Sequence, residues 1–345
     1  MRDVAEGAGV SINTASRALN NKPEISPETK AKVLQVAQSL GYRPNRLARA
    51  LRSNKTGTIG VIVGDIVNPY FAMLVRGIER TARQFDYSVI LQGTDEDYDR
   101  EEEAIEIALA EQVDGILITP TQKGTETVEE LVTSGTPFVL MSRYFKDLDT
   151  DYVVMDDRRG GFLATEHLIQ KGHSRIAILN GPLHISSATE RYEGYLEAFK
   201  HYGLEPDKAL VEQGCLTVED GYRAALRLLE GPVRPTAVFA FSDFVAFGVL
   251  RAANELELMV PEDLSVMGFD DTFFGACMRP PLTTVGGNPE ALGERAARLL
   301  FEELMTTKAS KPIQIRLPVR LVQRGSTGKP KGGDVRGKAQ ATSKG

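Results

Sequence analysis

The sequence predicts an α/β protein in which a short segment of three helices precedes a larger region built from parallel sheets. Residues 1–55 contain ten Lys and Arg against four Asp and Glu, a net charge of +6 in a chain whose total is −6, so the remaining residues carry −12. From Thr58 onward, short β-branched runs alternate with amphipathic helical stretches, which is typical of parallel sheets covered by helices on both faces. The charge asymmetry indicates a piece that binds a polyanion, joined to a piece with another task.

Composition places the chain among ordinary globular proteins, since 42% of its 345 residues are apolar and 26% are charged. It has no run of about 18 apolar residues that would cross a membrane, and its N-terminus lacks the apolar segment of an export signal. Neither a disulfide framework nor a metal-ligand spacing can be built from Cys215, Cys277, His167, His173, His184 and His201. We therefore expect a cytoplasmic protein without a metal or other cofactor.

Residues 2–19 predict two short helices joined by a tight turn. Gly9 suits the end of the first helix, and Ser11 is a good N-cap for the second, residues 12–19. The residues expected to face inward are Val4, Ala5, Ala8, Ala15, Ala18 and Leu19. This is the pattern of a helix-turn-helix, whose second helix enters the DNA major groove.

A third helix has a strong start signal, with Ser26 as N-cap and Pro27 at the first helical position. It is expected to end at Gly41. Its predicted buried stripe consists of Val33, Leu34, Ala37 and Leu40. Gly7 is expected to weaken the first helix by roughly 1 kcal/mol relative to Ala.

The outward face of residues 12–19 carries side chains that suit DNA. The guanidinium of Arg17 can donate two hydrogen bonds to guanine, and the amide of Asn13 can pair with adenine. Short hydroxyl side chains of the kind that bind phosphates are Ser11, Thr14, Ser16 and Thr29. An isolated Arg17 would more often be a solvated surface residue, but within a helix-turn-helix pattern we favour base contact.

The next segment, residues 42–53, reads YRPNRLARALRS. Its arginines recur every three residues, while Leu47, Ala48 and Leu51 share another side. About two turns of helix are too few to be stable alone, so such a helix needs a partner. An apolar side chain flanked by arginines, such as Leu51, has the character of a wedge that opens a minor-groove step. The alternative is a basic linker, and spacing alone leaves both interpretations open.

The region after Thr58 predicts two doubly wound lobes, because its strand candidates show no barrel-like continuity. The strand candidates are residues 58–64, 87–92, 115–119, 137–142, 152–157, 175–181, 237–243 and 264–270. The helical stretches include residues 71–85, 99–111, 160–171, 191–202 and 244–255.

Ligands of open α/β sheets bind outside the carboxyl ends of the strands, where polar residues follow several predicted strands. These residues are Asp65, Asn68, Arg143, Asp156, Ser242 and Asp270. Arg191 follows a loop and can reach the same edge. Arginine and aspartate beside aromatic rings suit a sugar, because they bind its hydroxyls while a ring covers its CH face. The alternatives are that Asn68 and Pro69 only begin a helix, and that Asp270 and Asp271 cap the next one.

Several stretches resemble the LacI/GalR family of bacterial transcription regulators. They include DVAEGAGVSINTASRALN, YRPNRLARALRS, TIGVIVGDIVNPYFAMLVRGIE, GHSRIAILNGP, FSDFVAFGVLRAA and VPEDLSVMGFDD, in the order of that family. The resemblance implies a DNA-binding headpiece, a hinge helix and a periplasmic-binding-protein-like core, in a regulator that is usually a repressor. Such proteins bind near-palindromic operators as dimers or tetramers. Because no leucine heptads follow the core, we expect a homodimer.

The resemblance also implies domain boundaries. The headpiece would span residues 1–43, the hinge helix and linker residues 44–57, and the core residues 58–324. Lobe one would comprise about 58–157 plus 290–318, and lobe two about 160–285. Residues 325–345 are rich in Gly, Lys and Ser, and we expect them to be disordered.

Binding residues are implied in the same way. Ile12, Asn13 and Arg17 would read bases in the major groove, and Ala48 and Leu51 would enter the minor groove at the centre of the operator. A sugar or related effector would lie between the lobes. Its contacts would be Asn68, Tyr70, Phe71, Arg143, Arg191, Ser242 and Asp270, with Phe241 and Asp156 as weaker candidates.

The chain departs from the family at two places. Family members usually have a hydroxyl and an aliphatic residue before the position of Arg2, whereas here Met1 precedes it. The first helix then lacks a side-chain N-cap, a loss of about 1 kcal/mol, and we expect native residues upstream. Many sugar-binding relatives have Gln or a charged residue at the position where this chain has Gly286, Gly287 and Asn288. The residues that line this side of the effector pocket are therefore not predicted.

Two other function classes fit less well. A sugar-binding protein that serves a transporter would carry an export signal and no DNA-reading arm. An enzyme of doubly wound fold would show a phosphate loop, a GxSxG elbow or a GxGxxG after its first strand, and the sequence has none of these. The sequence therefore favours a regulator, whose effector could be a pentose, a hexose, a sugar acid or a purine.

Overall fold

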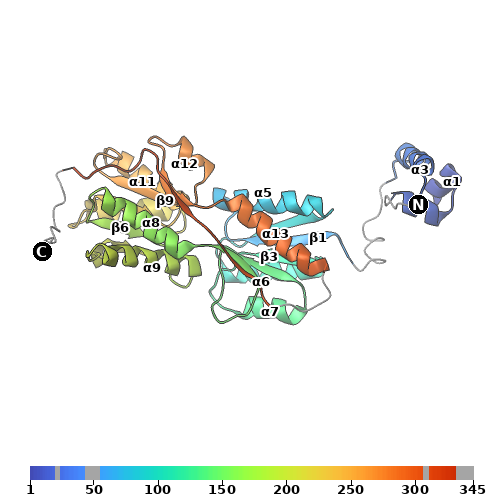
Figure 1. Ribbon diagram of the computed structural model, residues 1–345, viewed down its shortest axis with the longest axis horizontal. Coiled ribbons are helices and arrows are strands. Elements are labelled where there is room, and N and C mark those ends of the chain that lie inside the picture. The colour runs from blue at the N-terminus through green and yellow to red at the C-terminus, as the bar shows by residue number, and fades with distance from the viewer. Residues whose placement is uncertain (20–23, 43–54, 306–310, 332–345) are drawn as a thin grey trace, which may run out of the picture. The chain divides into compact units, whose positions relative to one another are not determined.

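The computed structural model describes residues 1–19, 24–42, 55–305 and 311–331. Its contacts divide the chain into two units, Met1–Gly57 and Thr58–Gly345. Figure 1 shows the first unit as a small group of helices and the second as an α/β body. The α/β class predicted from the sequence is confirmed.

The first unit contains α1 (Arg2–Ala8), α2 (Ile12–Leu19) and α3 (Pro27–Ser39). Gly9 ends α1 in the left-handed conformation, with φ of 65°. Before α2, the backbone N–H of Thr14 donates to Ser11 Oγ at 3.0 Å. Before α3, the N–H of Thr29 donates to Ser26 Oγ at 3.2 Å. Both predicted N-caps are therefore made.

A small apolar core joins the three helices. Its buried members are Val4, Ala5, Ala8, Ala15, Ala18, Val33 and Ala37. The predicted stripe of α3 is wrong for Leu34 and Leu40, which are 45% and 53% exposed. The buried side of α3 carries Val33 and Ala37; Leu34 lies off that side, and Leu40 follows the helix as its C-cap.

Gly7 lies where α1 packs on α3. A Cβ at this position would lie 2.7 Å from Val36 Cγ1, which is closer than two carbon atoms approach without bonding. The glycine costs helix propensity but permits this close packing. The sequence predicts a hinge helix and linker at residues 44–57. Most of this segment lies outside the described residues, because residues 43–54 are not described.

The second unit contains two six-stranded sheets, and we name the two halves of the unit after them. The sheet of the first lobe has the order β11-β5-β4-β3-β1-β2, and that of the second lobe β12-β10-β9-β8-β6-β7. Described strand pairs are parallel except β10 with β12. The first sheet comprises β1 (Thr58–Val63), β2 (Ser88–Gly93), β3 (Gly115–Ile118), β4 (Phe138–Met141), β5 (Tyr152–Met155) and β11 (Gln314–Leu317). The second comprises β6 (Ile176–Leu179), β7 (Val211–Glu212), β8 (Ala237–Ala240), β9 (Ser265–Phe269), β10 (Thr283–Gly286) and β12 (Arg320–Val322).

Helices cover both faces of each sheet. In the first lobe, α5 (Pro69–Gln84) and α13 (Pro289–Met305) cover one face, and α6 (Tyr98–Ala110) and α7 (Glu126–Ser134) the other. In the second lobe, α8 (Asp157–Gln170) and α9 (Ser186–His201) cover one face, and α10 (Val218–Glu230) and α11 (Asp243–Glu255) the other. The short α12 (Phe273–Cys277) and the 3₁₀ turn η1 (Lys208–Leu210) belong to the second lobe.

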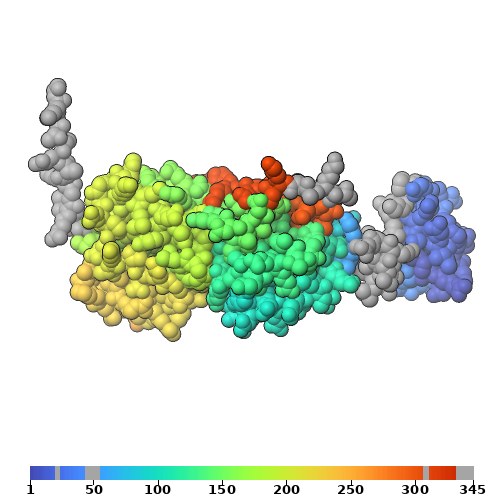
Figure 2. Space-filling view, turned by 90° about the horizontal axis from the view of Figure 1, so that it is seen from below, coloured from blue at the N-terminus to red at the C-terminus, as the bar shows by residue number. Residues whose placement is uncertain are grey.

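The chain passes between the lobes in three places, after β5, after β10 and between β11 and β12. These crossings lie side by side: a Cβ on Gly287 would lie 2.6 Å from Met155 Sδ and 3.1 Å from the Pro318 carbonyl oxygen. Figure 2 shows the two lobes in direct contact on one face of the second unit. Three adjacent connections allow the lobes to move as bodies about one line.

Three helix pairs approach closely through one glycine from each helix. In each case a Cβ on the glycine would lie 2.0–2.2 Å from a backbone oxygen of the partner helix. The pairs are α5 with α13 (Gly77 and Gly293), α8 with α9 (Gly161 and Gly194), and α10 with α11 (Gly221 and Gly248). Backbone contact of this kind fixes the helices of each layer relative to one another.

The chain after β12 is ordered as far as Lys331, which corrects the disorder predicted for residues 325–345. Ser326 Oγ donates to the Val266 carbonyl oxygen at 2.6 Å and accepts from the N–H of Thr283 at 2.8 Å. The Gly328 N–H donates to Ser265 Oγ at 2.9 Å. Small and hydroxyl residues therefore complete the hydrogen bonds of buried strands, a role that composition does not reveal. Residues 332–345 lie outside the described part of the chain.

Candidate functional site

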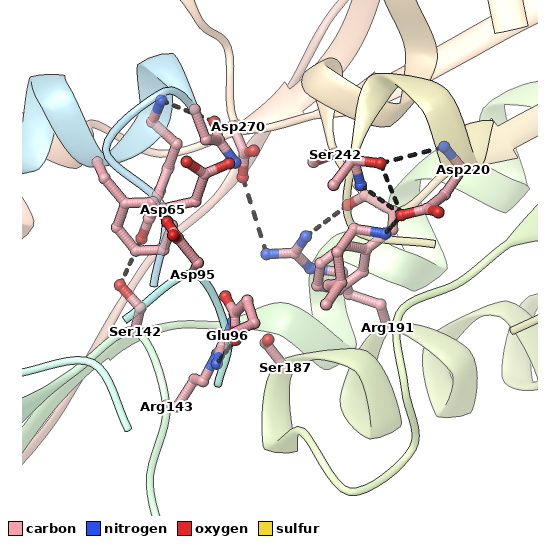
Figure 3. A pocket seen from close by; sticks show the side chains of 16 residues that line it. Asp65, Asp95, Glu96, Ser142, Arg143, Ser187, Arg191, Asp220, Ser242 and Asp270 are labelled. Carbon is pink, nitrogen blue, oxygen red and sulfur yellow. Dashed lines mark hydrogen bonds and ion pairs between the residues drawn. The ribbon is translucent and has the colours of Figure 1, made fainter. Parts of the chain in front are cut away.

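A cavity of about 380 Å³ lies between the lobes, where residues that follow the strands of both sheets come together (Figure 3). This volume suits a small molecule. The first lobe contributes Asp65, Asn68, Tyr70, Phe71, Asp95, Glu96, Ser142 and Arg143. The second lobe contributes Ser187, Arg191, Leu216, Thr217, Asp220, Phe241, Ser242 and Asp270.

All seven residues that the resemblance assigned to effector binding border this cavity, as do Asp65 and the weaker candidate Phe241. Asp156 does not border the cavity; its Oδ1 accepts the N–H of Arg159 at 3.1 Å and caps α8. Asn68 also begins a helix, as the alternative interpretation stated: its Oδ1 accepts the N–H of Tyr70 at 3.0 Å. The structure brings the predicted residues together, and their binding of a ligand stays a prediction.

Arg191 is the central cation of the cavity. Its Nε donates to Asp157 Oδ1 at 2.7 Å and its Nη1 to the Phe241 carbonyl oxygen at 2.5 Å. Its Nη2 lies 3.8 Å from Asp270 Oδ1 (Figure 3). The guanidinium also lies over the rings of Phe241 and Phe269, 4.5 and 3.6 Å from their centroids. These contacts fix the orientation of the group and leave Nη2 directed toward the cavity.

Three buried carboxyl groups lie at or next to the cavity. Burial raises the pKa of Asp157 and that of Asp243 to about 6 each, and it raises the pKa of Asp270 well above its usual range. The charge of Arg191 opposes this rise at Asp157 and Asp270. Asp243 accepts hydrogen bonds from the N–H of Thr272 at 2.7 Å and the hydroxyl of Thr284 at 2.6 Å.

The second arginine of the cavity is already paired. Nη1 and Nη2 of Arg143 donate to Oε2 and Oε1 of Glu96, both at 2.7 Å. Nη1 also donates to the Pro120 carbonyl oxygen at 2.9 Å. The resemblance assigned Arg143 to a ligand, whereas its fork of donors holds a carboxylate of the protein itself.

Aromatic rings from both lobes form apolar walls. Tyr70 and Phe71 pack edge to face, with ring centroids 5.2 Å apart, and Phe241 of the second lobe also borders the cavity. The hydroxyls of Tyr70 and Ser142 are 2.7 Å apart, and burial raises the pKa of Tyr70, so this phenol stays protonated. Ser242 Oγ accepts the N–H of Val245 at 3.1 Å and caps α11. Rings and hydroxyls of this kind match the faces and edges of a sugar.

Sequence reasoning missed seven residues that border the cavity: Asp95, Glu96, Ser142, Ser187, Leu216, Thr217 and Asp220. The rule that ligands bind at carboxyl ends of strands would have found Asp95 and Glu96, which follow β2, and Ser142, which follows β4. The others lie at helix starts or in a loop of the second lobe, where no local pattern marks them.

Contacts beside the cavity join the two lobes directly. Arg316 on β11 donates to both carboxylate oxygens of Glu190 on α9, at 2.8 and 2.9 Å. The Tyr144 hydroxyl donates to Glu190 Oε1 at 2.6 Å. The Ser186 N–H donates to Gln122 Oε1 at 2.8 Å. These contacts hold the lobes in their present arrangement.

The headpiece presents most of its predicted DNA contacts on its surface. Ser11, Ile12, Asn13 and Arg17 are exposed, and Ile12 is 52% exposed although it is apolar. Thr14, Ser16 and Thr29 are half-buried. Ala48 and Leu51 lie outside the described residues. The second helix thus offers a contiguous polar face with one apolar side chain at its start.

Within residues 1–19, 24–42, 55–305 and 311–331, no group of three His, Cys, Asp or Glu is placed to hold a metal ion. Within the same ranges, no helix has the length and apolar character needed to cross a membrane.

Family models match both units. Residues 1–45 match the bacterial regulatory proteins of the lacI family, and residues 56–325 match the periplasmic binding proteins and sugar binding domain of the LacI family. The chain belongs to the LacI family. A LacI-family chain is a DNA-binding transcriptional regulator, and this one is not an enzyme.

Curated and solved proteins agree with this LacI-family assignment. The ribose operon repressor of Escherichia coli (strain K12) is 37% identical over 94% of this chain and 99% of its own length. Catabolite control protein A of Priestia megaterium is 38% identical over 94% and 98%. The lac repressor dimer bound to operator and the anti-inducer ONPF superposes with a TM-score of 0.82 at 29% identity, over 94% and 98% of the two chains. The complex of the transcriptional regulator CelR with cellobiose gives a TM-score of 0.73 at 31% identity, with the same coverage.

Proposed function

We propose that this LacI-family chain is a cytoplasmic homodimeric repressor that binds a near-palindromic operator, and that a sugar bound between its lobes controls its operator affinity. One observation carries the proposal. The same chain combines an exposed second helix of a helix-turn-helix with an interlobe cavity bordered by all seven residues expected to bind an effector.

DNA reading is assigned to the exposed face of α2. Arg17 has the planar fork of donors that suits guanine, and Asn13 has the amide that suits adenine. Ile12 offers an apolar contact of the kind that meets a thymine methyl group. Ser11 and Thr14 stand at the start of α2, where hydroxyls and helix N–H groups hold phosphates. In our proposal Ala48 and Leu51 enter the minor groove at the operator's centre.

The ligand is assigned to the interlobe cavity. Arg191 and Asp270 offer a donor and an acceptor for hydroxyl groups, and Tyr70, Phe71 and Phe241 offer ring faces. Two similar proteins support a sugar: one is named ribose operon repressor, and the other was solved with cellobiose. A ligand controls operator affinity only if it binds the two arrangements of the lobes unequally.

The homodimer is supported by the lac repressor, which was solved as a dimer on its operator. Two headpieces related by a twofold axis read two half-sites of opposite orientation, so the operator shares the symmetry of the protein.

The assignment of base reading to α2 is tested with two variants, Arg17→Ala and Arg2→Ala. A duplex selected from a random pool by the wild-type protein serves as operator, and a scrambled duplex as reference, at fixed physiological salt. Arg17→Ala is expected to lower operator affinity about tenfold or more while leaving scrambled-duplex affinity nearly unchanged, because a base contact contributes about 1–3 kcal/mol. Arg2→Ala removes an exposed arginine of α1 and is expected to affect both duplexes equally.

Equal weakening of both duplexes by Arg17→Ala would contradict base reading by α2. A wild-type protein that selects no sequence at all would contradict the proposed function as a whole.

A further inference from the structure

The cavity holds more negative than positive charge. Five carboxyl groups border it, those of Asp65, Asp95, Glu96, Asp220 and Asp270, against the two guanidinium groups of Arg143 and Arg191. Asp95 is paired with Arg100, which does not line the cavity, and burial raises the pKa of Asp270, so the unneutralised negative charge comes from Asp65 and Asp220. Whether a ligand can be an anion therefore depends on whether either arginine is free to receive it.

Arg143 is occupied by Glu96. Both terminal nitrogens donate to the two oxygens of that carboxylate at 2.7 Å, and the side chains are only 5% and 18% exposed. This paired fork is the geometry with which arginine binds the carboxylate or phosphate of a ligand. Figure 3 shows Glu96 against Arg143 at the side of the cavity away from Asp270. Glu96 thus stands where an anionic ligand group would otherwise bind.

The backbone is shaped to hold Glu96 there. Asp95 and Glu96 both adopt positive φ, 50° and 58°, a conformation that costs free energy in residues with a side chain. Directly after β1, a Cβ on Gly64 would lie 2.2 Å from Glu96 Oε1, so a larger residue there would displace the carboxylate from this position. Two residues at positive φ and a glycine that leaves space for the carboxylate indicate that the position of Glu96 is specified by the fold.

Arg191 does not offset the excess of negative charge in the cavity, because its Nε donates to Asp157. Asp157 adds a further carboxyl group next to the cavity. Two bordering carboxylates are held by uncharged donors: Asp65 Oδ1 accepts the N–H of Val67 at 2.8 Å, and Asp220 Oδ2 accepts the hydroxyl of Thr217 at 2.7 Å. Their negative charge remains in the cavity and repels anions.

We propose that Glu96 is a built-in anion that occupies Arg143, so that the cavity accepts uncharged or amine-bearing sugars and rejects phosphorylated and carboxylated ones. This inference rests on the proposed function only in taking the cavity as the effector site. It makes Glu96 the residue that determines the charge of the effector.

Inorganic phosphate is the probe, because it needs no fit to an unidentified sugar. The melting temperatures of the full-length wild type, Glu96→Gln and Glu96→Ala are measured in phosphate and in chloride at equal ionic strength. Both variants are expected to bind phosphate at least about tenfold more tightly than the wild type, because a freed guanidinium gains charge-assisted hydrogen bonds. The extra stabilisation should disappear in Glu96→Gln/Arg143→Gln. Glu79→Gln, which removes a carboxylate from the exposed pair with Arg83 on α5, is the matched control and should respond as the wild type does.

An equal phosphate response in the wild type and both Glu96 variants would overturn the assignment of Glu96. Stabilisation of the wild type by ribose 5-phosphate or glucose 6-phosphate equal to that by ribose, glucose or glucosamine would overturn the exclusion of anions. Binding to the selected operator, with and without a stabilising sugar, is measured on the same variants, and it shows that they are folded. A wild type that prefers no DNA sequence under either condition would contradict the proposed function, whereas an equal phosphate response in all variants would contradict only the role of Glu96.

Discussion

Asp243 is fully buried next to the cavity, and hydroxyl and amide donors hold its carboxylate. Burial raises the pKa of Asp243 from 3.8 to about 6. The folded protein therefore binds a proton at this site at pH values where the unfolded chain has released it. Between the two pKa values the native state binds more protons, so the free energy of unfolding contributed by Asp243 falls as pH rises.

The variant Asp243→Asn tests this account of a buried carboxyl group, because it keeps the shape of the side chain and removes its titration. The variant's free energy of unfolding, relative to the wild type, is expected to rise by about 3 kcal/mol between roughly pH 4 and pH 6 and to be level outside that window. Urea unfolding of both proteins across this range measures it. Groups that Asp243 does not influence cancel in the comparison, including His167, whose pKa is lowered to about 4 and whose contribution has the opposite slope. A difference that does not change with pH would show that Asp243 does not titrate there.

Residues of the cavity differ in how far the sequence predicts them. Asn68 and Asp270 follow strands and lie in motifs of the family, so both periodicity and resemblance point to them. Glu96 also follows a strand, but its effect depends on meeting Arg143, which is 47 residues away in the chain. Ser187 and Thr217 reach the cavity only because helices of the second lobe are packed in a particular way. Contacts between distant residues carry no local signal.

The packing of α8 on α9 positions Arg191 against Asp157. Gly161 of α8 meets α9 at Arg191 itself, since a Cβ on this glycine would lie 2.1 Å from the Arg191 carbonyl oxygen. The helix would have to move away to admit a methyl group. The ion pair between Arg191 and Asp157, with its 2.7 Å hydrogen bond, depends on this approach.

Gly161→Ala is therefore expected to destabilise the second unit by about 1–3 kcal/mol, because overpacking outweighs the better helix propensity of alanine, about 1 kcal/mol. Urea unfolding measures this. Arg159→Ala changes an exposed residue of the same helix and should leave stability nearly unchanged. A Gly161→Ala protein as stable as the wild type would contradict the close packing.

Most buried strands were predictable, whereas three of the four edge strands and the interior strand β10 were not. All eight predicted strands exist; all but the half-buried β2 are buried apolar runs between turn signals. The short β7, β11 and β12 lie at the edges of the sheets and are only half-buried, so their pattern is weak. Residues 325–331 are held in place by hydroxyl groups that complete the hydrogen bonds of neighbouring strands. The amino-acid composition of this segment does not reveal such contacts.

At the scale of the whole molecule, the second unit has two bodies with three adjacent connections and a cavity between them. Arg316 and Tyr144 of the first lobe both bind Glu190 of the second, so these side chains hold the lobes together beside the cavity. A ligand that bridges the cavity adds contacts to one arrangement of the lobes. The difference in its affinity for the two arrangements is the free energy available to change DNA binding.

The measurement that tests the central claim most directly is the affinity of the full-length protein for its selected operator, by fluorescence anisotropy, with and without a saturating sugar. The sugar is one that a thermal-shift screen shows to stabilise the wild type but not Arg191→Ala. The account predicts that this ligand changes the dissociation constant for the operator at least about fivefold and leaves that for a scrambled duplex unchanged. An operator affinity that stays constant while the cavity is occupied would contradict it.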